Sequence, residues 1–149
     1  MAKLEAIWIK RAKQGPMDSK SEAELVAGKG LRDNANQKGR RQVTIIEQEV
    51  WEMLMAELGG DLPPTSRRAN LMVSGFPLKD SRGKVLRIGN CRIIIKGETK
   101  PCNLMEETLP GLRERMFPEW RGGAFGQVLD DGIIRVGDTL SWETEEAIK

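Results

Sequence analysis

The residues best suited to chemistry are a cysteine and a later arginine followed by two glycines. Cys102 follows a proline at the expected end of a strand. A free thiol has a pKa near 8.5, so about 3% is thiolate at pH 7, and a nearby cation or helix N-terminus that lowers the pKa to about 6.5 raises this to roughly three-quarters. Lys100 and a helix predicted at residues 103–107 would both act in that direction. A buried, inert cysteine remains the alternative.

The later run is Arg121-Gly122-Gly123. Two glycines allow a close backbone approach and positive φ angles, so that amide groups can point at an anion while Arg121 supplies charge. The alternative is a tight turn into the next strand.

Two arginine pairs stand at the starts of predicted strands. Arg40 and Arg41 come before one strand, and Arg67 and Arg68 come before another that begins at Asn70. Arginine is suited to bidentate contacts with phosphate and other oxyanions. An ordinary surface charge is the alternative for each one.

The sequence has no histidine. It can therefore form neither a Ser-His-Asp triad, a Cys-His dyad nor a His-ligated metal site from its own residues. Two cysteines are too few for a disulfide framework. The other cysteine, Cys91, alternates with Ile93 and Ile95 on one face of a predicted strand, which favours a packing role.

The composition indicates one soluble domain over residues 1–149, with a core at about 4–143. We expect no membrane span, because no apolar run approaches about 18 residues. We see no secretory signal and expect a cytoplasmic protein. The net charge is +2, but Lys and Arg exceed Asp and Glu in residues 1–41 and 67–102. These blocks could form a positive opening for an anionic ligand or be solvated strand faces.

The elements that must position these residues are mostly strands. Apolar and β-branched runs predict strands at residues 4–10, 41–46, 70–73, 85–88, 91–96, 124–129, 133–136 and 140–143. Residues 85–88 and 91–96 should form a hairpin through Gly89-Asn90. An amphipathic helix begins at Glu47 and ends at Gly59-Gly60. Residues 11–38 are predicted to form a long binding loop, in which 21–26 could be a short helical turn.

This pattern predicts a mainly β fold, a closed or partly closed β-barrel with a few short helices. Several short runs, in this order, also resemble the MOSC family, named for the C-terminal domain of molybdenum cofactor sulfurase. They are Gly30-Leu31, residues 41–46, Arg68-Ala69-Asn70-Leu71 with Ser74-Gly75, residues 86–90, Pro101-Cys102-Asn103 with Glu106, Arg121-Gly122-Gly123 and residues 134–138. The resemblance covers about residues 4–143.

The resemblance implies a barrel of the pyruvate-kinase type with a cysteine in a pocket. Cys102 matches the cysteine that carries sulfur as a persulfide or ligates molybdenum. Arg41, Arg68 and Arg121, with Asn70, Gly122 and Gly123, match the positions that would hold the molybdenum cofactor (molybdopterin) or molybdate. The resemblance leaves open whether the protein is an enzyme, either a sulfurtransferase or part of a cofactor-dependent reductase.

One departure from the family is visible. Many members carry a Gly-Asp-x-His stretch, whereas residues 30–39 here contain Asp33 but no histidine. The implied partners are a sulfur-donating cysteine desulfurase or a molybdoenzyme. The alternative function is a non-catalytic partner module of such an enzyme. Nucleic acid is not an expected partner, because no basic stripe interleaved with aromatic residues is present.

Overall fold

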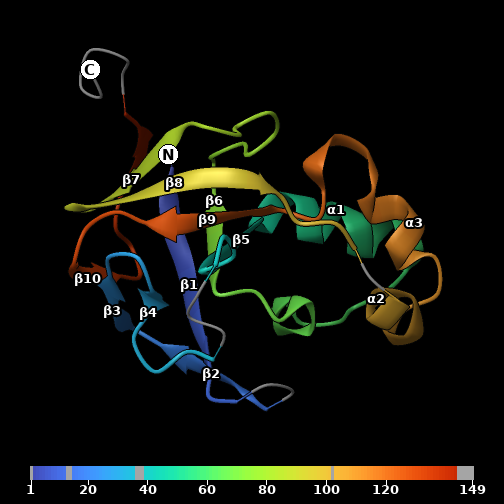
Figure 1. Cartoon of the computed structure of the whole chain (residues 1–149). Coiled ribbons are helices and arrows are strands. Elements are labelled where there is room, and N and C mark those ends of the chain that lie inside the picture. Colours follow the sequence, from blue (N-terminus) through green and yellow to red (C-terminus); the bar gives the residue numbers. More distant parts are fainter. Residues whose placement is uncertain (1, 13–14, 36–38, 102, 144–149) are drawn as a thin grey trace.

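The structure is a computed structural model that describes residues 2–12, 15–35, 39–101 and 103–143. Strands dominate it, and the helices gather at one end (Figure 1). The strands are β1 (Lys3–Lys10), β2 (Met17–Lys20), β3 (Glu22–Val26), β4 (Gly30–Leu31), β5 (Val43–Glu47), β6 (Leu71–Ser74), β7 (Val85–Ile88), β8 (Cys91–Glu98), β9 (Ala124–Val128), β10 (Gly132–Arg135) and β11 (Leu140–Trp142). The helices are α1 (Gln48–Leu58), α2 (Asn103–Thr108) and α3 (Leu112–Met116), with 3-10 turns η1 (Pro64–Arg67) and η2 (Pro118–Trp120).

Eight strands form one sheet in the order β11-β7-β8-β9-β5-β6-β1-β2, and β10-β3-β4 form a second. The larger sheet curls into a half-barrel. Its β5–β6 pair is parallel, whereas the other described pairs of this sheet are antiparallel. The predicted mainly β, partly closed barrel is therefore confirmed.

Backbone hydrogen bonds join the start of β1 to the turn before β11. The Leu4 N–H donates to the Asp138 carbonyl at 2.9 Å, and the Gly137 N–H donates to the Leu4 carbonyl at 2.7 Å. The Leu140 N–H reaches the Ala2 carbonyl at 3.2 Å. We call these contacts the seam, because they link β1 and β11, which lie far apart in the order of the sheet.

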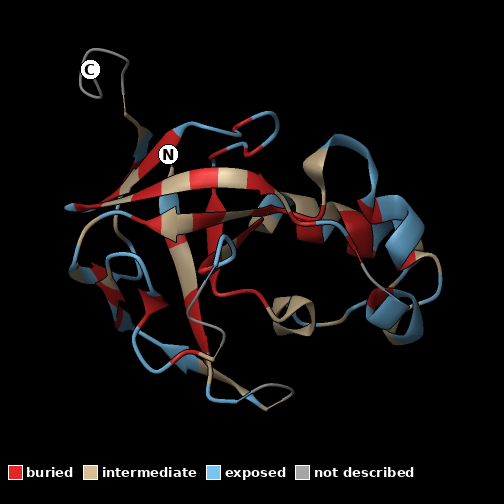
Figure 2. Ribbon diagram, viewed as in Figure 1, coloured by how far each residue is buried: buried red, intermediate tan, exposed pale blue. Residues whose placement is uncertain are grey.

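Buried residues of the strands form the main core, and Figure 2 shows these stretches of the ribbon in red. Along β8, buried and half-buried residues alternate, as expected for a strand with one face on the core. Cys91, Ile93 and Ile95 are all at most 1% exposed, which confirms the predicted packing role of Cys91. The hairpin between β7 and β8 is also confirmed, since Ile88 pairs with Cys91.

The amphipathic helix is confirmed as α1. Its apolar face buries Trp51, Leu54 and Met55 against the other two helices. Gly59 adopts a left-handed conformation at φ 64° and closes the helix, which is the usual role of a glycine at this position. The α1 helix forms the crossover that a parallel β5–β6 pair requires.

The prediction for residues 11–38 is corrected. The segment predicted as a long loop contains β2, β3 and β4, and residues 22–26 form a strand rather than a helical turn. The alternation of exposed Glu22 and Glu24 with buried Ala23 and Leu25 has the period of a strand. Pairing of β3 with β10 and β4 outweighs the helix propensity of these residues. No helix among the described residues is long and apolar enough to cross a membrane.

Candidate functional site

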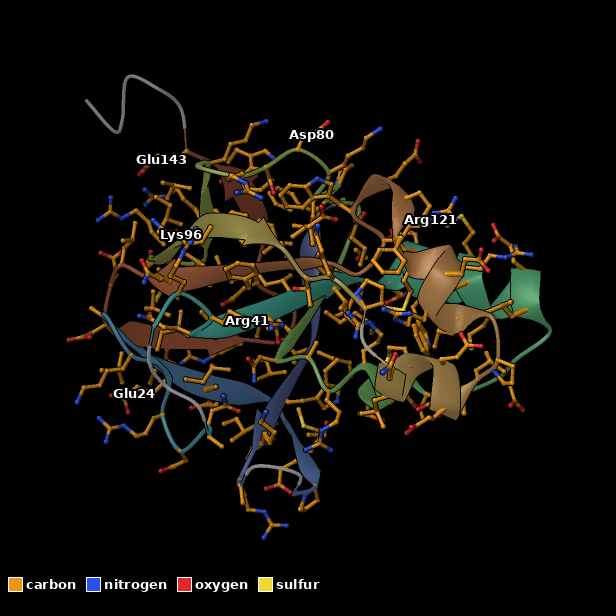
Figure 3. The ribbon with its side chains drawn as sticks, turned by 45° about the vertical axis from the view of Figure 1, so that its right-hand side comes forward. Glu24, Arg41, Asp80, Lys96, Arg121 and Glu143 are labelled. Atoms are coloured by element: carbon orange, nitrogen blue, oxygen red, sulfur yellow. The ribbon has the colours of Figure 1, made fainter. Side chains whose placement is uncertain are left out.

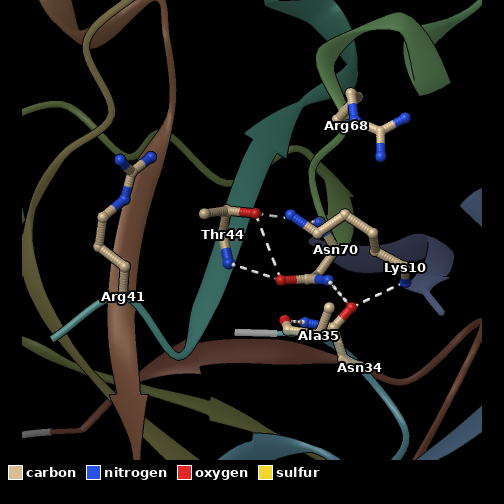
Figure 4. Close-up of a pocket in the computed structure, with 7 residues that line it drawn as sticks. All are labelled: Lys10, Asn34, Ala35, Arg41, Thr44, Arg68 and Asn70. Atoms are coloured by element: carbon tan, nitrogen blue, oxygen red, sulfur yellow. Dashed lines mark hydrogen bonds between the residues drawn. The ribbon is translucent and has the colours of Figure 1, made fainter. Parts of the chain in front are cut away.

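Two adjoining cavities open where β1 ends and where β5 and β6 begin. The first has a volume of about 330 Å³, and the second about 260 Å³. We call the two together the basic trough. The first is lined by Lys10, Asn34, Ala35, Arg41, Thr44, Arg68 and Asn70 (Figure 4). The second shares Lys10, Arg41, Thr44 and Arg68 and adds Ile46, Arg67, Ala69, Thr99, Lys100, Leu104, Met105 and Gly122.

Strand direction explains why residues distant in sequence meet here. β5 and β6 run parallel, with Ile45 opposite Leu71, so the residues that precede the two strands lie at the same edge of the sheet. Arg41 precedes β5, and Arg68 precedes β6. β1 runs antiparallel to β6, so its last residue, Lys10, comes to the same edge.

Asn70 holds this edge together. Its side-chain oxygen accepts hydrogen bonds from the Thr44 N–H at 3.1 Å and the Thr44 hydroxyl at 3.3 Å. Its side-chain nitrogen donates to the Trp8 carbonyl at 3.2 Å and to Asn34 Oδ1 at 3.0 Å. Asn34 Oδ1 also accepts from the Lys10 N–H at 2.8 Å. These bonds tie β1, β5, the start of β6 and the segment around Asn34 into one unit. Figure 4 shows those that join Asn70 to Thr44 and Asn34, and Asn34 to Lys10.

The trough is lined by positive charge. Its described lining residues include Lys10, Arg41, Arg67, Arg68 and Lys100 but no aspartate or glutamate. Such a set of like charges in a concave surface produces a positive potential that attracts anions. Figure 4 shows Arg41 and Arg68 on opposite sides of the first cavity. This charge pattern is the strongest chemical property of the site.

Local contacts hold the two arginines that Figure 4 displays. The Arg41 guanidinium lies 5.4 Å from the centre of the Phe125 ring, a distance at which a cation and an aromatic face attract each other. Arg68 donates from Nη2 to the Gly15 carbonyl at 2.6 Å. Its backbone is left-handed at φ 57°, which ends η1 and turns the chain into β6.

The wall of the second cavity depends on Gly122. A Cβ atom at this position would come within 1.9 Å of the Thr99 carbonyl oxygen, so only glycine fits. Arg67 donates from Nη2 to the Gly122 carbonyl and lies 3.6 Å from Met105 Sδ through Nη1. Arg67 thus connects η1, α2 and the segment before β9.

Thr99 adds a buried hydroxyl to this wall. The residue is 9% exposed, and its Oγ1 has no hydrogen-bond partner among the described residues. Its backbone is fixed, because the Thr99 N–H donates to the Gly123 carbonyl at 2.8 Å.

The other sequence-based site residues lie as follows. Cys102 lies outside the described residues, although Lys100 and Leu104, two positions away on either side, line the second cavity. Arg121 does not line the trough. It lies toward the helices, well away from Arg41 (Figure 3), where Nη1 is 3.2 Å from the Arg115 carbonyl and 3.9 Å from Glu57 Oε1. Gly123 lines neither cavity, and a Cβ atom at this position would come within 2.2 Å of the Ile45 carbonyl oxygen.

The second cysteine is separate from the trough. Burial, and then the charges of Asp130, Asp138 and Asp131, raise the pKa of the Cys91 thiol. This side chain therefore stays a protonated thiol at neutral pH.

The comparisons with known proteins agree with the fold. The family model described as MOSC domain matches residues 25–141. The chain belongs to the MOSC family. The matched range contains every residue that lines the trough except Lys10. A comparison with curated proteins gives no match.

Solved structures resemble this MOSC domain closely despite low sequence identity. The YuaD protein of Bacillus subtilis superposes with a TM-score of 0.81 at 18% identity over 93% of both chains. YiiM of Geobacillus stearothermophilus gives 0.75 at 15% identity over 97% of this chain and 76% of that chain. YiiM of Escherichia coli gives 0.71 at 15% identity over 96% and 70%. At these identities the likeness establishes the shared fold.

Sequence reasoning missed several lining residues of the MOSC domain. The sequence identified Lys10 only as the last residue of a predicted strand. Nothing near Asn34 or Thr44 in the sequence indicated that these residues would contact Asn70. Arg67 could be singled out in the sequence because it forms a pair with Arg68. Nothing in the sequence pointed to Thr99, because a buried hydroxyl without a partner can be recognised only in three dimensions.

The trough fits an anionic cofactor better than a metal ion held by the protein alone. The described residues contain no group of three or more Cys, Asp or Glu side chains that could hold a metal ion. The trough instead offers five cations, which are donors suited to phosphate or oxyanion groups.

Proposed function

We propose that this MOSC domain binds the molybdenum cofactor or molybdate in the basic trough and handles sulfur or the metal through Cys102. The observation that carries the proposal is the set of five cations, without any described carboxylate, that lines the two adjoining cavities. Two residues that line the second cavity, Lys100 and Leu104, flank Cys102 in sequence. A thiolate is a soft ligand suited to a transition metal or to sulfane sulfur.

Different residues of the chain have different roles in this binding. Arg41, Arg68 and Lys10 bind the phosphate or oxyanion in the first cavity, and Asn70 fixes the strand ends that carry them. Gly122 allows the ligand to approach the backbone of the second cavity. Arg121 acts indirectly, by holding the segment that carries Gly122 and Gly123. When bound, the molybdenum centre would supply oxygen-atom or electron transfer.

Sulfur transfer through Cys102 needs no outside oxidant. The Cys102 thiolate attacks the terminal sulfur of a donor persulfide, so one S–S bond forms as another breaks. The donor thiolate leaves with the electron pair, and Cys102 becomes a persulfide. The source we propose is a cysteine desulfurase, and the receiver is a molybdoenzyme or its cofactor. Such persulfide chemistry fits the reducing cytoplasm, which is where we place the protein.

Metal and sulfur analysis tests this function. The wild type, purified from a molybdenum-replete host, should carry molybdenum and pterin or a persulfide detected as extra mass on the intact protein. Cys102→Ser should lose the persulfide, and Arg41→Ala with Arg68→Ala should lose bound molybdenum. Arg82→Ala is the matched control, since Arg82 is exposed and lies outside the trough.

Equal, near-zero molybdenum and sulfur in the wild type and both variants would contradict the proposal. A stable complex with a molybdoenzyme that forms without bound cofactor or persulfide would instead support the non-catalytic partner module.

A further inference from the structure

We propose that a cavity beside α1 is a docking site for a partner protein that inserts an apolar side chain flanked by lysine or arginine. The cavity has a volume of about 370 Å³. We call it the α1 groove, and it shares no lining residue with the basic trough. It is lined by Gln48, Trp51, Glu52, Met55, Asp61, Leu62, Pro64 and Met72.

One face of α1 and the segment that follows the helix form the two sides of the groove. The lining residues of α1 recur every three or four positions, which places them on the same face. The Trp51 Nε1–H donates to the Leu62 carbonyl at 3.0 Å and so fixes the other side. Met72 belongs to β6 and to a different buried cluster from Trp51 and Met55. The groove therefore lies where the helices meet the sheet.

Most of the lining is apolar, and two of its side chains are methionines, Met55 and Met72. Methionine is flexible and polarisable, so it adapts to apolar groups of different shape and is common at surfaces that bind protein partners. The volume is within the range of ordinary ligand pockets. The groove can thus take an apolar side chain from outside the chain.

Charge selects which partner fits. The described lining residues include Glu52 and Asp61 but no lysine or arginine. Both acids are exposed, and neither makes an ion pair within the part of the chain that the structure describes. Their carboxylates are therefore available to cations of a partner.

The other two acids of α1 are already engaged inside the protein. Glu49 Oε2 accepts a hydrogen bond from the Gly75 N–H at 2.7 Å. Glu57 Oε1 lies 2.7 Å from Arg115 Nη1. Residues 42–66 contain no lysine or arginine that could neutralise the groove locally. The acids at the groove thus differ from their neighbours on the helix in lacking a partner of their own.

These charges favour a protein over the other large partners. The phosphates of nucleic acids and of anionic lipids would be repelled by the carboxylates. A segment with lysine or arginine beside an apolar residue would instead match both the charge and the apolar lining. In such an interface the buried apolar anchor supplies most of the affinity, and the charges at the rim guide association and specificity.

Synthetic peptides test the groove. The first places leucine and lysine at the spacing of an amphipathic helix, the second has glutamate for lysine, and the third has alanine for leucine. In calorimetric titrations the first should bind the wild type, and the other two should bind at least about tenfold more weakly. Glu52→Lys combined with Asp61→Lys should weaken binding of the first peptide at least about tenfold and strengthen binding of the second.

The matched control reverses two exposed acids elsewhere. Glu107→Lys combined with Glu114→Lys changes the net charge equally, and neither residue lines the groove. This variant should bind the first peptide within about threefold of the wild type. Both double variants should unfold at the wild-type temperature, because substitutions at exposed positions change stability little.

Several results would overturn the proposal. One is that the first peptide does not bind the wild type. Equal losses in the two double variants would show a general attraction between charges, and equal binding of the alanine peptide would show that no apolar side chain enters the groove. Wild-type self-association in sedimentation, abolished by Glu52→Lys with Asp61→Lys and not by the control, would make a second copy of this chain the occupant instead.

Discussion

The side-chain amide of Asn70 makes all of its hydrogen bonds to other groups of the protein. Its oxygen accepts two bonds from Thr44, and its nitrogen donates to Trp8 and Asn34. The sequence led us to expect a ligand-binding asparagine at this position. In the structure the same residue lines the first cavity while its amide joins strands, so its first effect is on the shape of the trough.

Replacing Asn70 should therefore reduce stability. Asn70→Ala removes four side-chain bonds at a residue that is 5% exposed and leaves buried groups unpaired. We expect the free energy of unfolding to fall by about 2–4 kcal/mol in urea titrations. Ser141→Ala, at an exposed position, is the control and should change it by less than about 0.5 kcal/mol. An Asn70→Ala protein as stable as the wild type would show that these bonds contribute little.

Gly122 gives a second prediction at the residue scale. Gly122→Ala would press a methyl group into the Thr99 carbonyl, so the two segments must separate. We expect a loss of about 3 kcal/mol or more in the free energy of unfolding. Gly137→Ala is the matched control, because its φ of 99° is strained for alanine but nothing lies within 4 Å. It should lose only about 1–2 kcal/mol. Equal losses in the two variants would contradict the steric argument.

At the scale of the element, the turn from β5 into α1 carries a half-buried acid. Burial raises the pKa of Glu47, whose side chain is the last of β5, and nearby Glu49 adds to this. The folded state therefore holds a proton on Glu47 more tightly than the unfolded state does. The stability contributed by Glu47 is present below its unfolded pKa and is lost as the pH rises through its folded pKa.

The variant Glu47→Gln should remove this dependence. We expect it to unfold at a higher urea concentration than the wild type at pH 7, and the difference should vanish toward pH 3, where Glu47 is protonated in both states. Glu52→Gln, on the exposed face of α1, is the control. The measurement is the unfolding midpoint of all three proteins across pH 3 to 7. A difference between Glu47→Gln and the wild type that grows as the pH falls would contradict the sign.

Individual helices and hairpins were easier to predict from the sequence than the contacts between distant parts of the chain. The helix α1, the β7–β8 hairpin and the burial of Cys91 followed from periodicity and turn residues, because these are local properties. Strands β2 to β4 were missed because they are short, and β3 is stabilised by strands from elsewhere in the chain. Arg41 and Arg68 could be singled out by residue type. Their approach across one cavity depends on the β5–β6 register, which no local pattern contains.

At the scale of the whole molecule, the two larger of the three buried apolar clusters among the described residues must cooperate. One lies inside the curled sheet, and the other lies between α1, α2 and α3. The α1 helix follows directly from β5 and contacts β5 and β6, so loss of either core should loosen the trough between them. We infer that residues 4–143 unfold as one unit.

Leu54→Ala tests that cooperation. Leu54 is 1% exposed in the helical core, and its truncation should cost about 2–5 kcal/mol. Unfolding followed by tryptophan fluorescence and by far-ultraviolet circular dichroism should give one coincident transition in the wild type, which shifts as a whole in the variant. Two separated transitions, with only the earlier one moved by Leu54→Ala, would show that the helical core unfolds independently.

The seam determines how the protein should respond to a pulling force. The contacts between residues 2–4 and residues 137–140 lie near the two ends of the described chain, and Figure 1 shows both ends on the same side of the molecule. A pulling force applied through those ends would act on the seam before it reached the far end of β1, where Lys10 lies, or the segments before β5 and β6, where Arg41 and Arg68 lie. In a single-molecule stretching experiment the first event should be the peeling of β1 and β11 apart, at a force lower than that needed to break the β5–β6 pair. The protein would therefore open on the side away from the basic trough.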